Sequence, residues 1–247
     1  MNDDQLKRRF YPEANIAGFT QVDGTIAFYN QVAACIRPDH TVLEFGAGRG
    51  QQLAEDPIEF RRSAGNLKAR CAHLDGCDID SVILDNPYLD EAKVIEEGDP
   101  LPYEDERFDV IVARYVFEHV STPEQTAREL LRVLKPGGVI AATTPNKYGY
   151  IGLGARLVPN RYHVGALSRI QPNRKPEDVF PTLYKLNTAR ALNRHFGQHA
   201  EVFIAPIAAE PAYHFGKPWI YRSLKWLNKH APDHLLPILD VDIRKNA

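Results

Sequence analysis

A short apolar strand that runs directly into a glycine-rich loop constrains the fold of this chain more than any other feature. Residues 41–45 read Thr-Val-Leu-Glu-Phe, and glycine then recurs at Gly46, Gly48 and Gly50. Glycine permits a tight turn and lets a ligand lie against the backbone because no Cβ intrudes. The dinucleotide pattern G-x-G-x-x-G is missed by one position, where Gln51 stands. We therefore expect a buried strand that presents a ligand-binding loop unlike a standard dinucleotide site.

Strand and helix patterns alternate downstream of this loop. We expect strands at 71–78, near 94–95, at 110–113 and at 139–143, and helices over 51–62 and from 123 to about 134. Thr122 is the expected N-cap of the second helix, with Pro123 at its first position and Gln125 completing a capping box. Such alternation predicts an α/β fold with a doubly wound, mostly parallel sheet. Ligands bind beyond the carboxyl ends of the strands in these sheets.

The remaining sequence predicts one domain over residues 1–247. Its expected parts are a helical lead-in (1–40, loosely ordered over 1–20 and with a helix over 22–36), a ligand-binding core (41–145), a lid or insertion (146–186) and a C-terminal completion (187–247). The completion is expected to hold a helix from Asn187 to Gly197, a strand over 202–207 and a helix over 218–230.

Composition excludes several classes of protein. A hydrophobic fraction of 44% is ordinary for a globular chain, and no apolar stretch approaches the ~20 residues that span a bilayer. The first ten residues lack the apolar core of a secretory signal. Three scattered cysteines suit neither a disulfide framework nor a zinc site, and we expect no bound metal. These features predict a cytoplasmic protein.

Charge is divided unevenly along the chain. Residues 1–150 carry a net charge of −9, whereas residues 151–247 carry +7. The basic part is either a solvated surface or an attraction for an anionic acceptor, such as a phosphorylated or nucleotide-linked sugar.

Four motifs give the chain a family resemblance. The sequence VLEFGAGRG (42–50) resembles the first motif of class I S-adenosylmethionine-dependent methyltransferases. GCDID (76–80), LPYEDERFDV (101–110) and LRVLKPGG (131–138) resemble later motifs of the family and occur in its order. The resemblance covers about residues 41–145. It implies the Rossmann-like methyltransferase fold and S-adenosyl-L-methionine as the cofactor.

The resemblance also assigns cofactor-binding residues. It implies that the glycine loop contacts the methionine portion of the cofactor and that an acid at the end of the second strand binds the ribose. Asp78 matches that acid better than Asp80 does, and the adenine contact falls to Asp99 or Glu97, of which we favour Asp99. The full expected set is Glu44, Phe45, Gly46, Gly48, Gly50, Asp78, Ile79, Asp99 and Arg114.

Two histidines are candidates for a general base. His119 follows the strand expected at 110–113, and His163 lies in the expected lid. Histidine suits proton transfer near neutral pH, although a Glu-His pair at the position of His119 also occurs as scaffolding. Residues 178–188 resemble methyltransferases associated with bacterial surface polysaccharides, which implies a sugar hydroxyl as the acceptor. The function expected is therefore O-methylation of a glycan or another small molecule.

Other functions remain open on the sequence alone. They are N- or C-methylation of a small molecule, a catalytically silent cofactor-binding module, and a nicotinamide dehydrogenase, against which the missing third glycine argues. No nucleic-acid acceptor is expected, because Ala113-Arg114-Tyr115 stands where base methyltransferases often carry Asn/Asp-Pro-Pro-aromatic. The helix over 218–230 carries Trp219, Tyr221 and Trp226 beside basic residues, but packing on its own domain is expected more than membrane contact. No oligomeric state is predicted.

Overall fold

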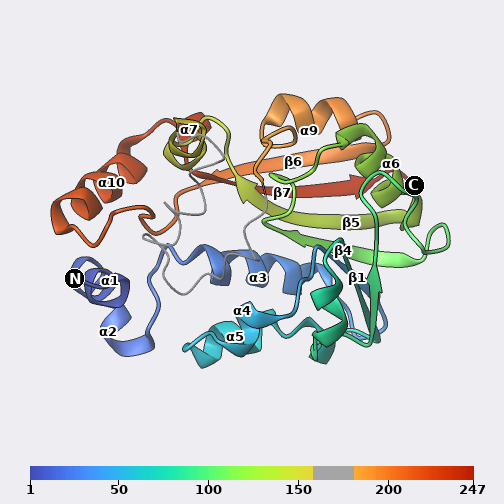
Figure 1. The fold of residues 1–247 in the computed structure, drawn as a ribbon, viewed down its shortest axis with the longest axis horizontal. Helices are drawn as coiled ribbons and strands as arrows, with labels where there is room; N and C mark the ends of the chain where they lie inside the picture. Colours follow the sequence, from blue (N-terminus) through green and yellow to red (C-terminus); the bar gives the residue numbers. More distant parts are fainter. Residues whose placement is uncertain (158–180) are drawn as a thin grey trace.

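A seven-stranded sheet forms the centre of the molecule. The computed structural model describes residues 1–157 and 181–247 (Figure 1). The sheet has the order β3-β2-β1-β4-β5-β7-β6. Its strands are β1 (Thr41–Phe45), β2 (His73–Asp78), β3 (Glu91–Val94), β4 (Phe108–Arg114), β5 (Leu134–Pro145), β6 (Ala200–Ile207) and β7 (Ile238–Lys245). The first five strands pair in parallel and β7 pairs antiparallel with β5 and β6, which confirms the mostly parallel, doubly wound sheet.

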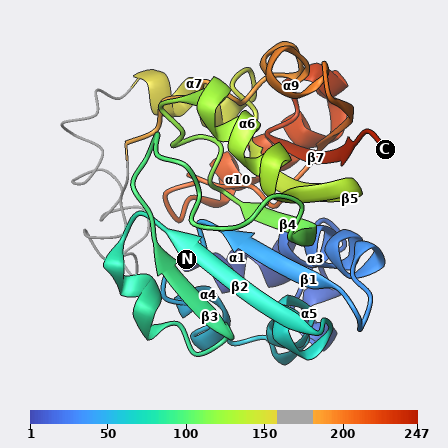
Figure 2. The same ribbon diagram turned by 90° about the vertical axis from the view of Figure 1, so that its right-hand side faces the viewer.

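Side-chain alternation along the strands builds a core on each face of this sheet. On β1, Val42 packs with one apolar cluster and Leu43 with the other. Val110 and Ile111 divide in the same way on β4, because successive side chains point to opposite faces of a strand. Figure 1 and Figure 2 show the helices on both faces.

The helices that cover the two faces come from different parts of the chain. They are α1 (Asp3–Phe10), α2 (Ala14–Ala17), α3 (Gly24–Cys35), α4 (Gln51–Ala54), α5 (Glu59–Gly65), α6 (Pro123–Val133), α7 (Tyr150–Leu157), α9 (Ala189–Phe196) and α10 (Pro218–His230). Helices α3 and α5 pack on one face of the sheet, and α6 and α9 pack on the other. The helices expected over 22–36, 187–197 and 218–230 are thus confirmed.

Three local predictions were wrong. The helix expected over 51–62 is two short helices, because Pro57 cannot continue a helix and disfavours helical geometry at Asp56. Thr122 is the N-cap residue of α6 and Pro123 its first residue, as predicted, but the Thr122 side chain forms no cap hydrogen bond and the backbone lies at φ −117° and ψ 67°. The capping box is therefore absent, and Gln125 lines a cavity instead. The strand expected at 139–143 is longer and begins at Leu134, with an irregular register against β4.

The first residues of the chain are helical rather than loosely ordered. Asn2 and Gln5 form a reciprocal capping box at the start of α1. The buried Leu6 and Tyr11 then pack against Tyr221 of α10. The Asn-x-x-Gln spacing, followed by basic residues in the last turn, is a local pattern that favours a helix here.

Strand β7 was not predicted, although its sequence alternates clearly. Leu239, Val241 and Ile243 are buried among the residues of one core cluster. Asp240 and Asp242 occupy the alternate positions, and Asp242 accepts a hydrogen bond from Gln31 of α3. The strand fits between β5 and β6, so the last residues of the chain complete the sheet.

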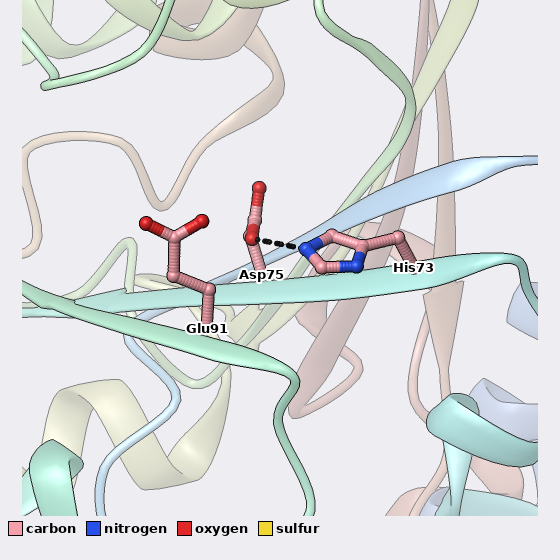
Figure 3. Close-up of side chains that lie close together, drawn as sticks. All are labelled: His73, Asp75 and Glu91. Atoms are coloured by element: carbon pink, nitrogen blue, oxygen red, sulfur yellow. Dashed lines mark hydrogen bonds and ion pairs between the residues drawn. The ribbon is translucent and has the colours of Figure 1, made fainter.

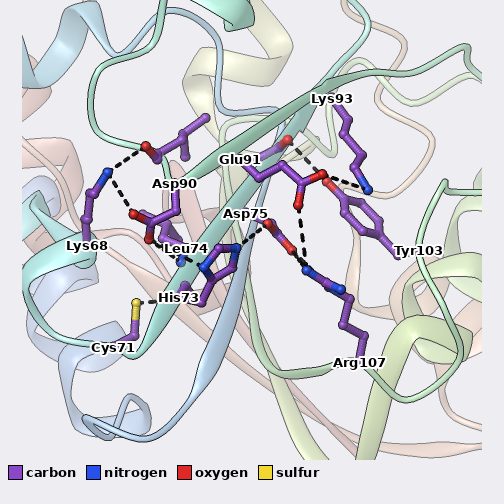
Figure 4. Close-up of polar contacts among 12 residues, drawn as sticks. Lys68, Cys71, His73, Leu74, Asp75, Asp90, Glu91, Lys93, Tyr103 and Arg107 are labelled. Atoms are coloured by element: carbon purple, nitrogen blue, oxygen red, sulfur yellow. Dashed lines mark hydrogen bonds and ion pairs between the residues drawn. The ribbon is translucent and has the colours of Figure 1, made fainter.

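An ion network around the buried Asp75 joins β2 to β3 and to the segment that precedes β4 (Figure 3 and Figure 4). Asp75 is fully buried, and its carboxylate accepts hydrogen bonds from Arg107 Nε at 3.0 Å and Nη2 at 2.8 Å. His73 Nε2 lies 3.0 Å from the other carboxylate oxygen, and Glu91 lies 3.8 Å from Arg107 Nη2. The ligand atoms of His73, Asp75 and Glu91 lie within 4.8 Å of one another. The Arg107 guanidinium already supplies the positive charge, so we interpret the cluster as a structural ion pair.

Removing Arg107 should destabilise the fold. Arg107→Gln leaves the buried Asp75 carboxylate without its cation, and we expect the free energy of unfolding to fall by about 3 kcal/mol. Urea denaturation measures this change. Arg244→Gln is the matched control, since its pair with Glu201 spans 3.9 Å between two side chains that are each 60% exposed, and it should cost less than ~1 kcal/mol. Equal costs for the two variants would contradict the structural role of the network.

Candidate functional site

A large cavity opens at the carboxyl ends of β1, β2 and β4, where the strand order of the sheet reverses. Its volume is about 1150 Å³. All of the expected cofactor-binding residues line it, namely Glu44, Phe45, Gly46, Gly48, Gly50, Asp78, Ile79, Asp99 and Arg114. His119 and Glu97 line it as well, whereas His163 lies outside the described residues. The structure thus brings the candidate residues together, while their roles stay predictions.

The glycine loop uses two of its glycines for different reasons. Gly46 has φ +75°, and a Cβ there would lie 2.4 Å from Cγ2 of Val116. Gly48 has φ +53°, but a Cβ there would meet no atom within 4 Å. Gly46 is therefore required by packing against the segment after β4, whereas the Cα of Gly48 faces open space beside the cavity.

Asp78 links the glycine loop to the end of β2. One carboxylate oxygen accepts a hydrogen bond from Gly48 N at 2.8 Å, and the other accepts one from Asp80 N at 3.0 Å. Burial raises the pKa of the Asp78 carboxyl. Asp80 instead accepts a hydrogen bond from Val82 N at the start of a 3₁₀ helix (Ser81–Asp85). Of these two acids, only Asp78 lines the cavity among the described residues.

Glu44, the penultimate residue of β1, and Arg114, the last residue of the neighbouring β4, lie at the cavity wall. Burial raises the pKa of Glu44 to about 7, against the lowering effect of the Arg114 charge. The Arg114 guanidinium lies over the rings of Tyr29 and Tyr115, at 5.6 and 5.2 Å from their centroids. Arg114 donates to Thr25 at 2.9 Å, but its buried Nε has no hydrogen-bond partner. A buried N–H donor without a partner is rare.

Glu97 and Asp99, the two candidates for the adenine contact, differ in their hydrogen bonds within the protein. Both Glu97 and Asp99 line the cavity, on either side of Gly98 at φ +91°. The Glu97 carboxylate accepts a hydrogen bond from Ser121 N. This contact leaves acceptor capacity on the Glu97 carboxylate, so the preference for Asp99 stays a prediction.

Acidic side chains predominate in the described lining of the cavity. Nine carboxylates line it, against the three guanidinium groups of Arg49, Arg61 and Arg114. The carboxylates belong to Glu44, Glu55, Asp56, Asp78, Glu96, Glu97, Asp99, Glu118 and Glu129. A cleft lined by one sign of charge concentrates ligands of the opposite sign, so this lining favours a cationic ligand.

His119 occupies the cavity and also braces the chain that returns at residue 181. Its Nδ1 lies 2.9 Å from the carbonyl oxygen of Pro181. The Glu118 carbonyl accepts hydrogen bonds from Leu183 N at 2.7 Å and Tyr184 N at 3.1 Å. The buried Glu118 carboxylate accepts from Thr144 Oγ1 at 2.9 Å and lies 4.0 Å from His119 Nε2. The position in the cavity and the bracing contacts, which the sequence offered as alternatives, therefore occur together.

Aromatic residues that the sequence analysis missed form another part of the lining. Tyr115, Tyr184, Tyr213 and Phe215 line the cavity, and each has a φ between +52° and +60°. Among the described residues, the remaining non-glycine residue with positive φ is Glu106. Strained backbone of this kind clusters at functional sites. No sequence pattern marks left-handed tyrosines, because tyrosine carries no preference for that conformation.

The raised pKa of Glu44 predicts an unusual pH dependence of stability. Between its ordinary value of 4.5 and about 7, the folded chain holds a proton on Glu44 that the unfolded chain releases. The contribution of this group to stability therefore falls as pH rises through that window, by about 1 to 3 kcal/mol. In Glu44→Gln the fall should vanish, so the variant gains stability relative to the wild type from pH 4.5 to pH 7.5. Urea unfolding at steps of pH measures the two curves, and parallel curves would contradict the prediction.

Comparisons with known proteins agree with this architecture. Residues 43–142 match the family described as "Methyltransferase domain". An uncharacterized methyltransferase of Mycobacterium leprae is 30% identical over 153 residues, which cover 60% of this chain and 55% of that protein. The chain thus spans about half the length of the curated relatives it matches.

Two further similarities extend the comparison. The ubiquinone/menaquinone biosynthesis C-methyltransferase UbiE of Vibrio campbellii is 30% identical over 111 residues, or 41% of this chain and 40% of that protein. A solved SAM-dependent methyltransferase of Methanosarcina mazei superposes with a TM-score of 0.53 at 18% identity, covering 87% of this chain and 97% of that one. The glycine loop, Asp78 and Glu44 all lie in or beside the matched stretch, at the carboxyl edge of a sheet with this topology. Residues 43–142 are therefore similar to a methyltransferase domain, and the chain has the Rossmann-like fold of the solved structures on which it superposes.

Proposed function

We propose that this protein transfers a methyl group from S-adenosylmethionine to a hydroxyl of a small acceptor, with sugars and glycans as the first class to test. The observation that carries the proposal is the orientation of His119 in the same cavity as the glycine loop. A carbonyl oxygen only accepts hydrogen bonds, so the contact with Pro181 holds the ring proton on Nδ1. Nε2 then carries the lone pair that a general base requires.

Several features of the cavity suit the cofactor. S-adenosylmethionine supplies an electrophilic methyl group on a sulfonium cation, and the acid-rich lining favours that charge. Gly48 leaves space for a ligand beside the loop. Asp78 uses one hydrogen bond on each carboxylate oxygen to hold the protein backbone, and each oxygen keeps a lone pair that can accept from a ribose hydroxyl.

The chain's own residues supply alignment and proton transfer. An in-line displacement is accelerated chiefly by holding the methyl donor and the acceptor oxygen close together and correctly aligned. A base adds ~10²–10⁴-fold for a hydroxyl acceptor. His119 would take the hydroxyl proton at Nε2, and the buried Glu118 carboxylate 4.0 Å away would stabilise the imidazolium that forms.

Aromatic rings support a sugar as the acceptor. Tyr115, Tyr184, Tyr213 and Phe215 offer apolar faces with nearby hydroxyls, and sugars stack on such faces. An anionic carrier on the acceptor stays a prediction from the basic residues of 151–247, because the described lining is itself acidic. We place the activity in the cytoplasm, since all three cysteines are free thiols.

Measurements of cofactor affinity should distinguish the role of Asp78 from that of Asp80. We expect Asp78→Asn to weaken S-adenosylmethionine and S-adenosylhomocysteine at least tenfold, because a charge-assisted hydrogen bond contributes about 1.5–3 kcal/mol. Asp80→Asn is the matched control and should leave affinity within about twofold, since Asp80 caps a 3₁₀ helix away from the cavity. Calorimetric titration measures both. Failure of the folded wild type to bind either compound would refute the proposed function.

Chemical rescue tests His119 as the base. We expect His119→Ala to lower kcat by ~10²–10³-fold while cofactor affinity stays unchanged, and added imidazole to restore part of the rate. If His119 only braced the chain near residue 181, added imidazole would not raise the rate of the variant at any concentration. The substrate for this assay comes from an acceptor screen with radiolabelled cofactor. Methylation of carbon or nitrogen only, or cofactor binding without any turnover, would refute O-methylation.

A further inference from the structure

Both tryptophans of the chain lie exposed on one face of α10. The sequence contains two tryptophans. Trp219 is 70% exposed and Trp226 is 62% exposed. Tryptophan is on average a strongly buried residue. The two are seven positions apart, which places them two turns apart on the same side of the helix. In Figure 1, α10 lies at one end of the molecule, beside α1.

Other apolar side chains extend this exposed surface. Phe215, just before α10, is 62% exposed, and Leu227 is 39% exposed. We call Phe215, Trp219, Trp226 and Leu227 the tryptophan face. The opposite side of α10 is firmly packed, because Tyr221 is fully buried against α1 and Asn228 Nδ2 donates to Ala209 O at 2.8 Å. The exposure is therefore a property of a fixed helix. It also corrects the expected grouping of Tyr221 with the two tryptophans.

The tryptophan face is flanked by positive charge. Residues 211–232 contain four basic residues and no acidic residue. Lys217, Arg222 and Lys229 are exposed, whereas the fourth, Lys225, is turned inward and donates to Phe10 O. The nearest acids of α1 are engaged, since Asp3 pairs with Lys7 and His214, and Asp4 pairs with Arg8.

From this juxtaposition we propose that the tryptophan face docks on the surface of a bilayer that contains anionic lipids. Indole rings partition to the level of the lipid headgroups, and Phe and Leu reach into the acyl boundary. Exposed Lys and Arg side chains beside them pair with anionic headgroups. The described helices include none long and apolar enough to cross a membrane, so the attachment is peripheral.

Other occupants fit the face less well. A second copy of the chain docked through the same face would bring Arg222 and Lys229 close to their own equivalents, which costs energy without acids between them. A nucleic acid would pair with the cations and stack on the indoles. It would gain little from Leu227, and Trp226 already stacks on His230 at a centroid distance of 4.7 Å.

Docking would also position the cavity. Phe215 belongs to the tryptophan face and lines the cavity, and it follows Tyr213 in the same wall. A residue that is both 62% exposed and part of the lining lies at the opening. Attachment through this face therefore brings the cavity opening to the membrane surface, independently of which acceptor the cavity takes.

Vesicle binding tests the proposal on the intact protein. The probes are phosphatidylcholine vesicles with and without phosphatidylglycerol, followed by co-sedimentation and by intrinsic fluorescence, to which both tryptophans contribute. We expect binding and a blue shift of emission with the anionic vesicles, and at least tenfold weaker binding to neutral vesicles or in 0.5 M salt.

Two double variants should separate the apolar and charged contributions. Trp219→Ala with Trp226→Ala, and Arg222→Gln with Lys229→Gln, should each weaken sedimentation at least tenfold without lowering Tm. The matched controls are Phe203→Ala on β6, where the side chain is 52% exposed, and Arg190→Gln with Arg194→Gln on α9, and they should bind as the wild type does. No vesicle binding would overturn the proposal, as would equal losses in the controls. Tryptophan-dependent dimerisation, or oligonucleotide binding without vesicle binding, would equally overturn it in favour of those partners.

Discussion

Parallel pairing of β1 with β2 on one side and β4 on the other brings the carboxyl ends of three strands to one edge of the sheet. Each strand contributes its next residues to the same cavity. Backbone hydrogen bonds then hold the glycine loop against β2, with Gly46 N 2.8 Å from Cys77 O. Asp78 adds a side-chain bond to Gly48 N. If this pairing were shifted by one residue, Glu44 would turn from the cavity edge to the other face of the sheet.

Burying acids at this edge is costly, and the surroundings reduce the cost in two ways. Backbone N–H groups stabilise the Asp78 carboxylate, whereas Glu44 has the nearby Arg114 charge. The pKa of each nonetheless rises, because burial outweighs these contacts. A cationic ligand would lower both pKa values, so the electrostatics of this edge and the charge of a sulfonium are complementary.

The cavity has a second half that depends on segments distant in sequence. Glu118 and His119 hold the chain that returns at residues 181–184. Residues of α7 and of the 212–215 segment before α10 complete this part of the lining. Tyr150 Oη accepts a hydrogen bond from Ala212 N at 2.9 Å, which joins α7 to the segment before α10. The same segment leads into the tryptophan face. The 212–215 segment therefore joins this wall of the cavity to the exposed aromatic surface.

The sequence by itself determined the central sheet and the half of the cavity that would bind the cofactor. The boundaries of β1 were predicted residue for residue, because a buried strand before a glycine loop is a local pattern, whereas Asp78 was preferred over Asp80 on the family resemblance. The alternation of Leu239, Val241 and Ile243 is a local strand pattern, although β7 was not predicted from it. The helix predicted over 51–62 was too long, because Pro57 divides this segment into two short helices. Only the tertiary structure decided the rest. The ring orientation of His119 and the burial of Tyr221 depend on contacts between residues about 60 to 210 positions apart, and the left-handed backbone of the cavity tyrosines follows no local pattern. No local pattern encodes such contacts, because they form only when the sheet and its helices have packed.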